Sequence, residues 1–190
     1  FDMVEAYALL RAPVADGLVV KLGRFVTPLG AEVIDAPGNR LPSRSLLFGY
    51  AIPFAHVGAL ATLSLGDTTA IGYGLVLGWD VFDDPNDALT HLATFSFTSP
   101  SGEDTLAVNA ILGAERAGDD DALRAVFDAT WTHTWSDDGT TTLNADVGFA
   151  ERAGADGGDA TFGGVAAYGA HRVTDRLSAT LRVEAFFDPD

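Results

Sequence analysis

The fold is decided by the stretch LRAVFDATWTHTW at residues 123–135. Bulky or apolar residues fill most of its odd positions, and polar or charged residues fill most of its even positions. Because successive side chains of a β-strand point to opposite faces, this alternation predicts a strand with one apolar and one polar face. Strands of soluble proteins usually have about 5–6 residues, whereas a strand crossing a bilayer needs roughly 9–11. The length therefore favours a membrane-spanning strand.

The same pattern continues on both sides of this stretch, interrupted by short polar turns about 36 residues apart. These turns lie near residues 66–67, 100–104, 136–139 and 173–176, with longer Asp- and Gly-rich connections between them. Short turns on one side and long loops on the other are typical of outer-membrane barrels. The alternation is ambiguous only in residues 89–99, where His91 shares the bulky face. We predict ten strands, at residues 1–11, 18–26, 55–66, 68–79, 89–99, 105–115, 123–135, 140–151, 160–172 and 177–187.

The predicted fold is all-β: an antiparallel, up-and-down transmembrane β-barrel that forms a single domain over residues 1–190. Because neither end of the chain shows a natural start or stop, we expect these strands to be a fragment of a larger barrel. Strands must cross in pairs, so residues 27–54 are predicted to be one long loop folded toward the lumen. A short helix is expected to begin at residues 42–45 and to end before Gly49. The alternative, an extra strand at residues 45–52, breaks the pairing.

Composition excludes several classes of protein. The formal net charge of −16 argues against nucleic-acid binding, and the absence of cysteine excludes disulfides and thiolate metal sites. No apolar run approaches the roughly 18 residues of a transmembrane helix. The acidic residues gather in predicted connections, including residues 80–87, 119–121 and 156–159, where a solvated loop surface is expected. Binding of divalent cations at a lipopolysaccharide-rich surface is a further hypothesis for these acids.

Several motifs resemble those of a known family. They are Gly-Arg-Phe-Val-Thr-Pro-Leu-Gly at residues 23–30, Ser-Arg-Ser at 43–45, Gly-Trp-Asp at 78–80 and Leu-Arg-Val-Glu at 181–184. With these motifs the chain resembles the OmpL-like β-barrel porins of bacterial outer membranes. The resemblance implies an outer-membrane location, with membrane lipid and lipopolysaccharide as partners. Family members are longer, carry a signal peptide and continue with further strands.

The polar face of such a barrel surrounds an aqueous lumen. We expect that lining to include Lys21, Arg124, Asp128, Asn144, Asp146, Arg182 and Glu184. An internal salt-bridge network that only holds the barrel together is the alternative for these charges.

The long loop carries four charged residues that would narrow the pore and set its selectivity: Glu32, Asp35, Arg40 and Arg44. A simple surface cap is the alternative for this loop. Large aromatic residues near strand ends suggest interfacial girdles, formed by Trp79, Trp131, Trp135 and Phe187.

Signals for catalysis are poor. The four histidines, His56, His91, His133 and His171, occur singly without metal-ligand spacing, and no nucleophile motif is present. We therefore expect no enzyme activity, no cofactor and no metal. The predicted function is passive diffusion of small hydrophilic solutes or ions through an outer-membrane channel. The alternatives are a non-conducting structural or interaction barrel and, less favoured, a soluble β-sandwich binding module. The oligomeric state is not predicted.

Overall fold

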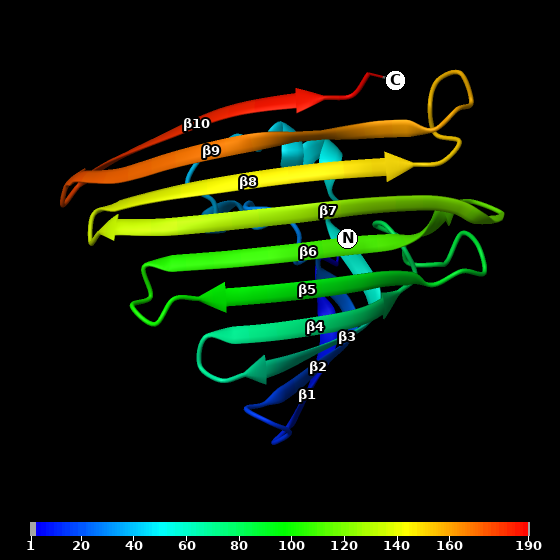
Figure 1. The fold of residues 1–190 in the computed structure, drawn as a ribbon, viewed down its shortest axis with the longest axis horizontal. Coiled ribbons are helices and arrows are strands. Elements are labelled where there is room, and N and C mark those ends of the chain that lie inside the picture. Colours follow the sequence, from blue (N-terminus) through cyan, green and yellow to red (C-terminus); the bar gives the residue numbers. More distant parts are fainter. Residues whose placement is uncertain (1–2, 190) are drawn as a thin grey trace.

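The computed structural model describes residues 3–189 and shows a single antiparallel sheet of ten strands in chain order (Figure 1). The predicted all-β meander of ten strands is confirmed. The first two residues of the first predicted strand lie outside the described residues, as does residue 190. The strands are β1 (Ala6–Ala12), β2 (Leu18–Val26), β3 (Ala55–Leu65), β4 (Thr69–Val76), β5 (Thr90–Thr98), β6 (Asp104–Arg116), β7 (Asp119–Ser136), β8 (Gly139–Ala150), β9 (Ala160–Thr174) and β10 (Leu177–Phe187).

The sheet is open in the described part of the chain. Each strand pairs with its neighbours in sequence, and β1 and β10 form the two edges without pairing with each other. None of the helical turns in residues 3–189 is long and apolar enough to cross a bilayer.

Three strand boundaries differ from the sequence prediction by three residues or more. The first strand, predicted from residue 1, begins at Ala6, and residues 3–5 lie outside it. The acidic residues 119–121 belong to β7 and not to a loop, because β6 and β7 are joined by a two-residue turn at Ala117 and Gly118, where Gly118 has a φ of +69°. Pairing of these strands continues past a bulge to Arg116 and Asp119. In contrast, β4 ends at Val76 instead of residue 79, and Gly78 then turns the chain with a φ of +134°.

The long loop between β2 and β3 contains two short helical turns. A 3₁₀ turn spans Ala36–Gly38, and a π-helical turn spans Leu47–Ala51. The second turn begins later than predicted and continues through Gly49, because the Ser45 hydroxyl and carbonyl accept bonds from the Phe48 and Gly49 amides. Helical geometry there excludes the alternative of an extra strand at residues 45–52.

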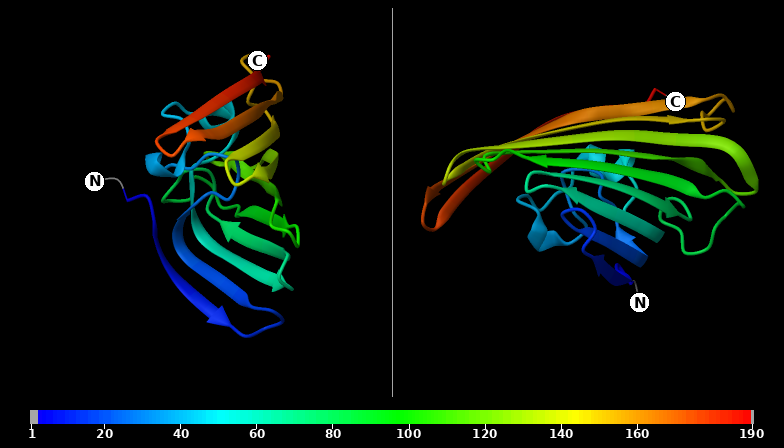
Figure 2. Two further views of the ribbon diagram at one scale, coloured as in Figure 1. Left: turned by 90° about the vertical axis from the view of Figure 1, so that its left-hand side faces the viewer. Right: turned by 60° about the horizontal axis from the view of Figure 1, so that its bottom comes forward.

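The sheet curves around the long loop, which lies on its concave side (Figure 2). The π-helical turn contacts β8 and β9. Buried apolar side chains of the loop and of the concave face form one cluster: Phe25, Leu29, Leu47, Ala51, Ile52, Leu60, Val76, Leu92, Ile111, Val126, Phe162, Ala166 and Tyr168. Hydrophobic burial therefore holds the loop against the sheet.

The opposite, convex face of the sheet is apolar and exposed. Phe127 on β7, Val165 on β9 and Leu181 on β10 have 59%, 57% and 67% of their surface exposed. Single exposed apolar residues are normal, but an apolar face shared by successive strands marks an interaction surface. These exposed bulky groups point away from the loop, as expected for a sheet whose convex side meets hydrocarbon.

Candidate functional site on the concave face

The residues predicted to line a lumen all lie on the concave face. Alternation along β7, β8 and β10 places Arg124, Asp128, Asn144, Asp146, Arg182 and Glu184 on the side that carries the loop. Lys21 on β2 is opposite Leu60 of the buried cluster, and its Nζ lies 4.9 Å from the centre of the Tyr7 ring. Their role in lining a pore remains a prediction.

A polar cluster occupies the centre of this face, beneath the start of the loop. The Asn109 amide donates to Asp128 Oδ2 at 2.7 Å and to the Pro28 carbonyl at 3.0 Å. The Asn144 amide donates to Asp128 Oδ1 at 2.9 Å. Asp128 and Asp146 are directly opposite on β7 and β8, with 1% and 4% of their surfaces exposed. Both carboxyl oxygens of Asp146 lack a hydrogen-bond partner in the described structure.

A second cluster fastens the loop to the sheet. Arg182 pairs with Glu32 at 3.0 Å, and both side chains are almost fully buried. The Arg182 guanidinium also donates to the carbonyls of Ser43 and Arg44, each at 2.9 Å. Glu184 accepts from Arg182 at 3.2 Å and from the Leu46 amide at 2.7 Å. Two predicted lining residues on β10 therefore anchor the loop.

Glu32 collects further donors from both sides of this contact. The Ser45 amide donates to one of its carboxyl oxygens at 2.8 Å, and the Tyr168 hydroxyl of β9 donates to the other at 3.1 Å. A carboxylate that accepts from three donor groups, Arg182, the Ser45 amide and the Tyr168 hydroxyl, is fixed in place, as buried charges require. Glu32 thus acts as a structural anchor, and its charge is already paired.

The other three charged loop residues have separate environments. Asp35 is exposed and precedes the 3₁₀ turn. Arg44 donates to the Ile34 carbonyl at 2.9 Å, and its guanidinium lies 5.4 Å from the Phe48 ring. Arg40 is exposed and lines a small pocket with Tyr168 and Thr142 of the sheet. The structure therefore does not bring the four predicted loop residues into one ring.

Comparison with known protein families identifies the family of this chain. The family described as "Putative beta-barrel porin-2, OmpL-like" matches residues 1–190. The chain belongs to this porin family. No curated protein and no solved structure matches the chain. In general terms it is thus an outer-membrane β-barrel porin, as the sequence motifs predicted.

Three of the four predicted girdle aromatics lie on the convex face of this porin sheet. Trp131 and Trp135 lie near the short-turn end of β7, where they stack on His133 and His171 with ring centres 5.8 and 5.4 Å apart. Phe187 lies at the opposite end of the sheet, paired with Gly163. All three side chains are substantially exposed. Their positions fit aromatic residues at two membrane interfaces, and that role remains a prediction.

Trp79 was wrongly placed in this girdle. Because β4 ends at Val76 and Gly78 turns the chain, the Trp79 ring packs against the buried cluster on the concave side. The Arg124 guanidinium lies 3.7 Å from its centre. The alternation of residues 69–79 could not indicate this turn, which depends on the conformation of one glycine.

Sequence reasoning missed the role of His56. Its side chain is fully buried at the start of β3, where Nε2 lies 3.1 Å from Thr27 Oγ1 and Nδ1 lies 3.2 Å from the Gly78 carbonyl. His56 therefore ties the beginning of the long loop to the connection after β4. Residues 3–189 contain no group of three His, Cys, Asp or Glu side chains that could hold a metal ion. The divalent-cation hypothesis for the acidic loops gains no support from that part of the chain.

Proposed function

We propose that this porin is an outer-membrane channel for the passive diffusion of small hydrophilic solutes or ions, narrowed by its long loop. The observation that carries the proposal is the opposition of the two faces. The convex face presents exposed apolar side chains, and the concave face gathers the charged and amide side chains around the loop. In a transmembrane barrel, the first face meets lipid and the second surrounds water.

A pore also requires the two sheet edges to be joined. Unpaired edge strands carry a row of free backbone donors and acceptors, which hydrocarbon does not tolerate. The edges formed by β1 and β10 must therefore pair in the membrane, either with each other or through additional strands. Membrane lipid and lipopolysaccharide are the proposed surroundings of the closed barrel.

Loop position supports a constriction. The loop crosses the concave face. Arg182 of β10 pairs with Glu32 in the first part of the loop and bonds to Ser43 and Arg44 further along it. Arg40 remains exposed beside that contact, so its charge faces the space that the loop narrows. Charged groups at the narrowest part of a pore bias its selectivity between anions and cations.

Single-channel recording in planar bilayers tests the proposal. The purified protein should produce discrete conductance steps, and Arg40→Ala should shift the reversal potential in a salt gradient toward cation preference. Arg176→Ala is the matched control, because this exposed arginine lies in the turn between β9 and β10. A wild-type protein without conductance steps would reject the channel, and identical selectivity of Arg40→Ala and wild type would reject the constriction.

A non-conducting barrel is the second candidate, favoured by one observation. The cluster that joins the loop to the sheet consists of buried apolar side chains, so it closes part of the concave face. Such a barrel would serve as a structural or interaction protein. Its signature is stable insertion into vesicles together with the absence of solute flux in a liposome-swelling assay.

A further inference from the structure

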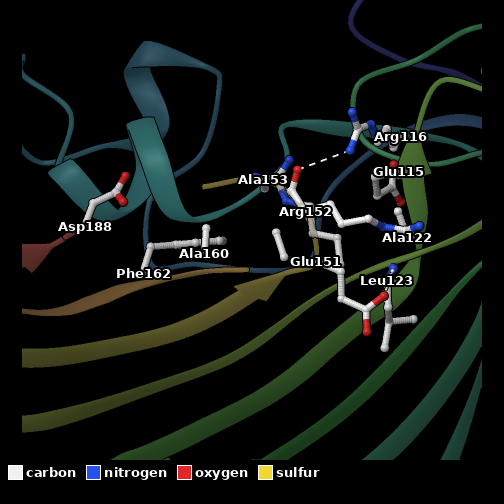
Figure 3. A pocket seen from close by; sticks show the side chains of 12 residues that line it. Glu115, Arg116, Ala122, Leu123, Glu151, Arg152, Ala153, Ala160, Phe162 and Asp188 are labelled. Carbon is white, nitrogen blue, oxygen red and sulfur yellow. Dashed lines mark hydrogen bonds between the residues drawn. The ribbon is translucent and has the colours of Figure 1, made fainter. Parts of the chain in front are cut away.

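A pocket of about 420 Å³ lies at the long-loop end of β6 to β9 (Figure 3). Its apolar wall consists of Ala122, Ala150, Ala160 and Phe162, all of them buried. Charged side chains complete the lining: Glu115, Arg116, Arg124, Glu151, Arg152 and Asp188. Figure 3 shows Phe162 and Ala160 between Asp188 on one side and the Arg116–Glu115 pair on the other. The pocket thus combines a small apolar surface with fixed charges.

Arg124 is the lining residue whose hydrogen-bonding capacity is unused. Its guanidinium stacks on Trp79 at 3.7 Å and lies 5.6 Å from the centre of the Phe162 ring. Its Nε is buried, and no group in residues 3–189 accepts a hydrogen bond from it. The indole nitrogen of Trp79 is also buried without an acceptor. Unsatisfied buried donors are costly, so this corner of the sheet is poorly satisfied. Trp79 does not line the pocket and both of these atoms are closed to it, so the donors that a ligand can reach are the terminal nitrogens of Arg124.

None of the three acids in the lining forms a hydrogen bond with Arg124, and two of them, Glu115 and Glu151, accept from other groups. Glu115 accepts from the Thr90 hydroxyl at 2.6 Å and from the Trp79 amide at 2.9 Å. Glu151 accepts from the Leu123 amide at 3.1 Å.

The other two arginines of the pocket are also engaged. Arg152 pairs with Asp119 at 3.2 Å, and Arg116 donates to the Arg152 carbonyl at 3.2 Å. An arginine stacked on an aromatic ring keeps its N–H groups in the guanidinium plane, where they fit a carboxylate. Arg124 is thus held ready for a planar anion.

The charge balance limits the kind of anion. Three arginines and three carboxylates line the pocket, so the fixed charges formally cancel. Because Arg152 and Arg116 are engaged elsewhere, Arg124 is the cation left for a ligand, and one guanidinium beside three carboxylates suits a monoanion better than a dianion such as phosphate. The wall of three alanines and one phenylalanine suits a short hydrocarbon chain.

We propose that this pocket binds a small aliphatic monocarboxylate, with its carboxylate on Arg124 and its hydrocarbon chain on the alanines and Phe162. The inference rests on the proposed function in one respect, because the carboxylate must reach the concave face through the water-filled pore. It adds a binding site and a solute class to the channel.

Saturation-transfer NMR with butyrate tests the site on the full chain in detergent micelles, at constant ionic strength set with chloride. Wild-type protein should give a saturable signal. Arg124→Gln should weaken affinity at least tenfold, and Arg124→Lys should weaken it less, since it keeps the charge but loses the planar fork. Arg172→Gln is the matched control, because Arg172 pairs with Asp138 at the opposite end of the sheet.

Several results would overturn the proposal. No saturable butyrate signal, equal binding of butylammonium, or tighter binding of inorganic phosphate would exclude a monocarboxylate site. If Arg124→Gln and Arg172→Gln lose the same butyrate affinity, the loss comes from the change in net charge and not from this pocket. If Arg124→Gln fails to fold, undiminished butyrate affinity of Arg124→Lys is the contradicting result. Butyrate binding without conductance would reject the channel alone, and conductance without butyrate binding would reject this site alone.

Discussion

Removing Arg182 should release the long loop from the barrel wall. The guanidinium pairs with Glu32, whose side chain is 6% exposed, and donates to two loop carbonyls. Breaking a buried ion pair from one side costs about 3–5 kcal/mol, because the remaining charge is left without its partner. Glu32 retains the Ser45 amide and the Tyr168 hydroxyl. We therefore expect Arg182→Leu to lower the free energy of unfolding by about 3 kcal/mol, at the low end of that range.

A double-mutant cycle separates this contact from general damage. Glu32→Gln removes the charge that Arg182 leaves unpaired, so the double variant should be more stable than the sum of the single changes by about 1–3 kcal/mol. The assay is urea unfolding in lipid vesicles, followed by tryptophan fluorescence. Arg172→Leu is the control, because its pair with Asp138 is about half exposed, and it should cost less than about 1 kcal/mol. A coupling energy below about 0.5 kcal/mol would refute the idea that the Arg182–Glu32 pair holds the long loop on the sheet.

Five further substitutions, at three places in the structure, are tested by the same unfolding assay. Asp146→Asn should stabilise the protein by about 1–2 kcal/mol, since the new amide can donate to Asp128. Asp128→Asn should destabilise it, because one of the two oxygens that accept from Asn109 and Asn144 becomes an NH2 donor that faces another donor. The opposite order would contradict the geometry of the polar cluster. Gly23→Ala should lower the free energy of unfolding by about 1–3 kcal/mol, because φ is +131° there and a Cβ would lie 2.4 Å from a backbone oxygen of β1. If the variant is as stable as the wild type, β1 and β2 do not approach each other at Gly23 as described. Phe127→Arg on the lipid side should lower the free energy of unfolding by about 2–4 kcal/mol. Thr132→Arg on the concave side of β7 should lower it by no more than the value of the one hydrogen bond of the Thr132 hydroxyl, about 1 kcal/mol. Equal losses of stability would mean that the two faces do not differ.

Strand alternation could be predicted because it is local. A strand has a period of two residues, so the bulky and polar faces of residues 123–135 follow directly from the order of side chains. Alternation also placed Arg182 and Glu184 on the polar face of β10. The partners of those residues could not be predicted, because Glu32 is 150 positions away in the chain and no local pattern connects them.

The strand ends were harder to predict. Polarity at residues 119–121 indicates contact with water, but it does not say whether the backbone is paired, and β7 continues through these acids as a hairpin with β6. The opposite error occurred at Trp79, where apolar alternation continued past the real end of β4. In both places the backbone at a glycine, Gly118 or Gly78, sets the boundary.

Cysteine labelling of two adjacent residues tests the two-faced sheet most directly. The natural chain contains no cysteine, so single cysteines can be introduced without background. Leu143 lies on the convex face of β8 and is 45% exposed, and Thr142 lies on the concave face beside Arg40. In lipid vesicles, a water-soluble thiol reagent should modify Thr142→Cys, and a lipid-attached quencher should affect only a fluorophore at Leu143→Cys. The reverse pattern, with the reagent at residue 143 and the quencher at residue 142, would contradict a sheet whose apolar side faces hydrocarbon.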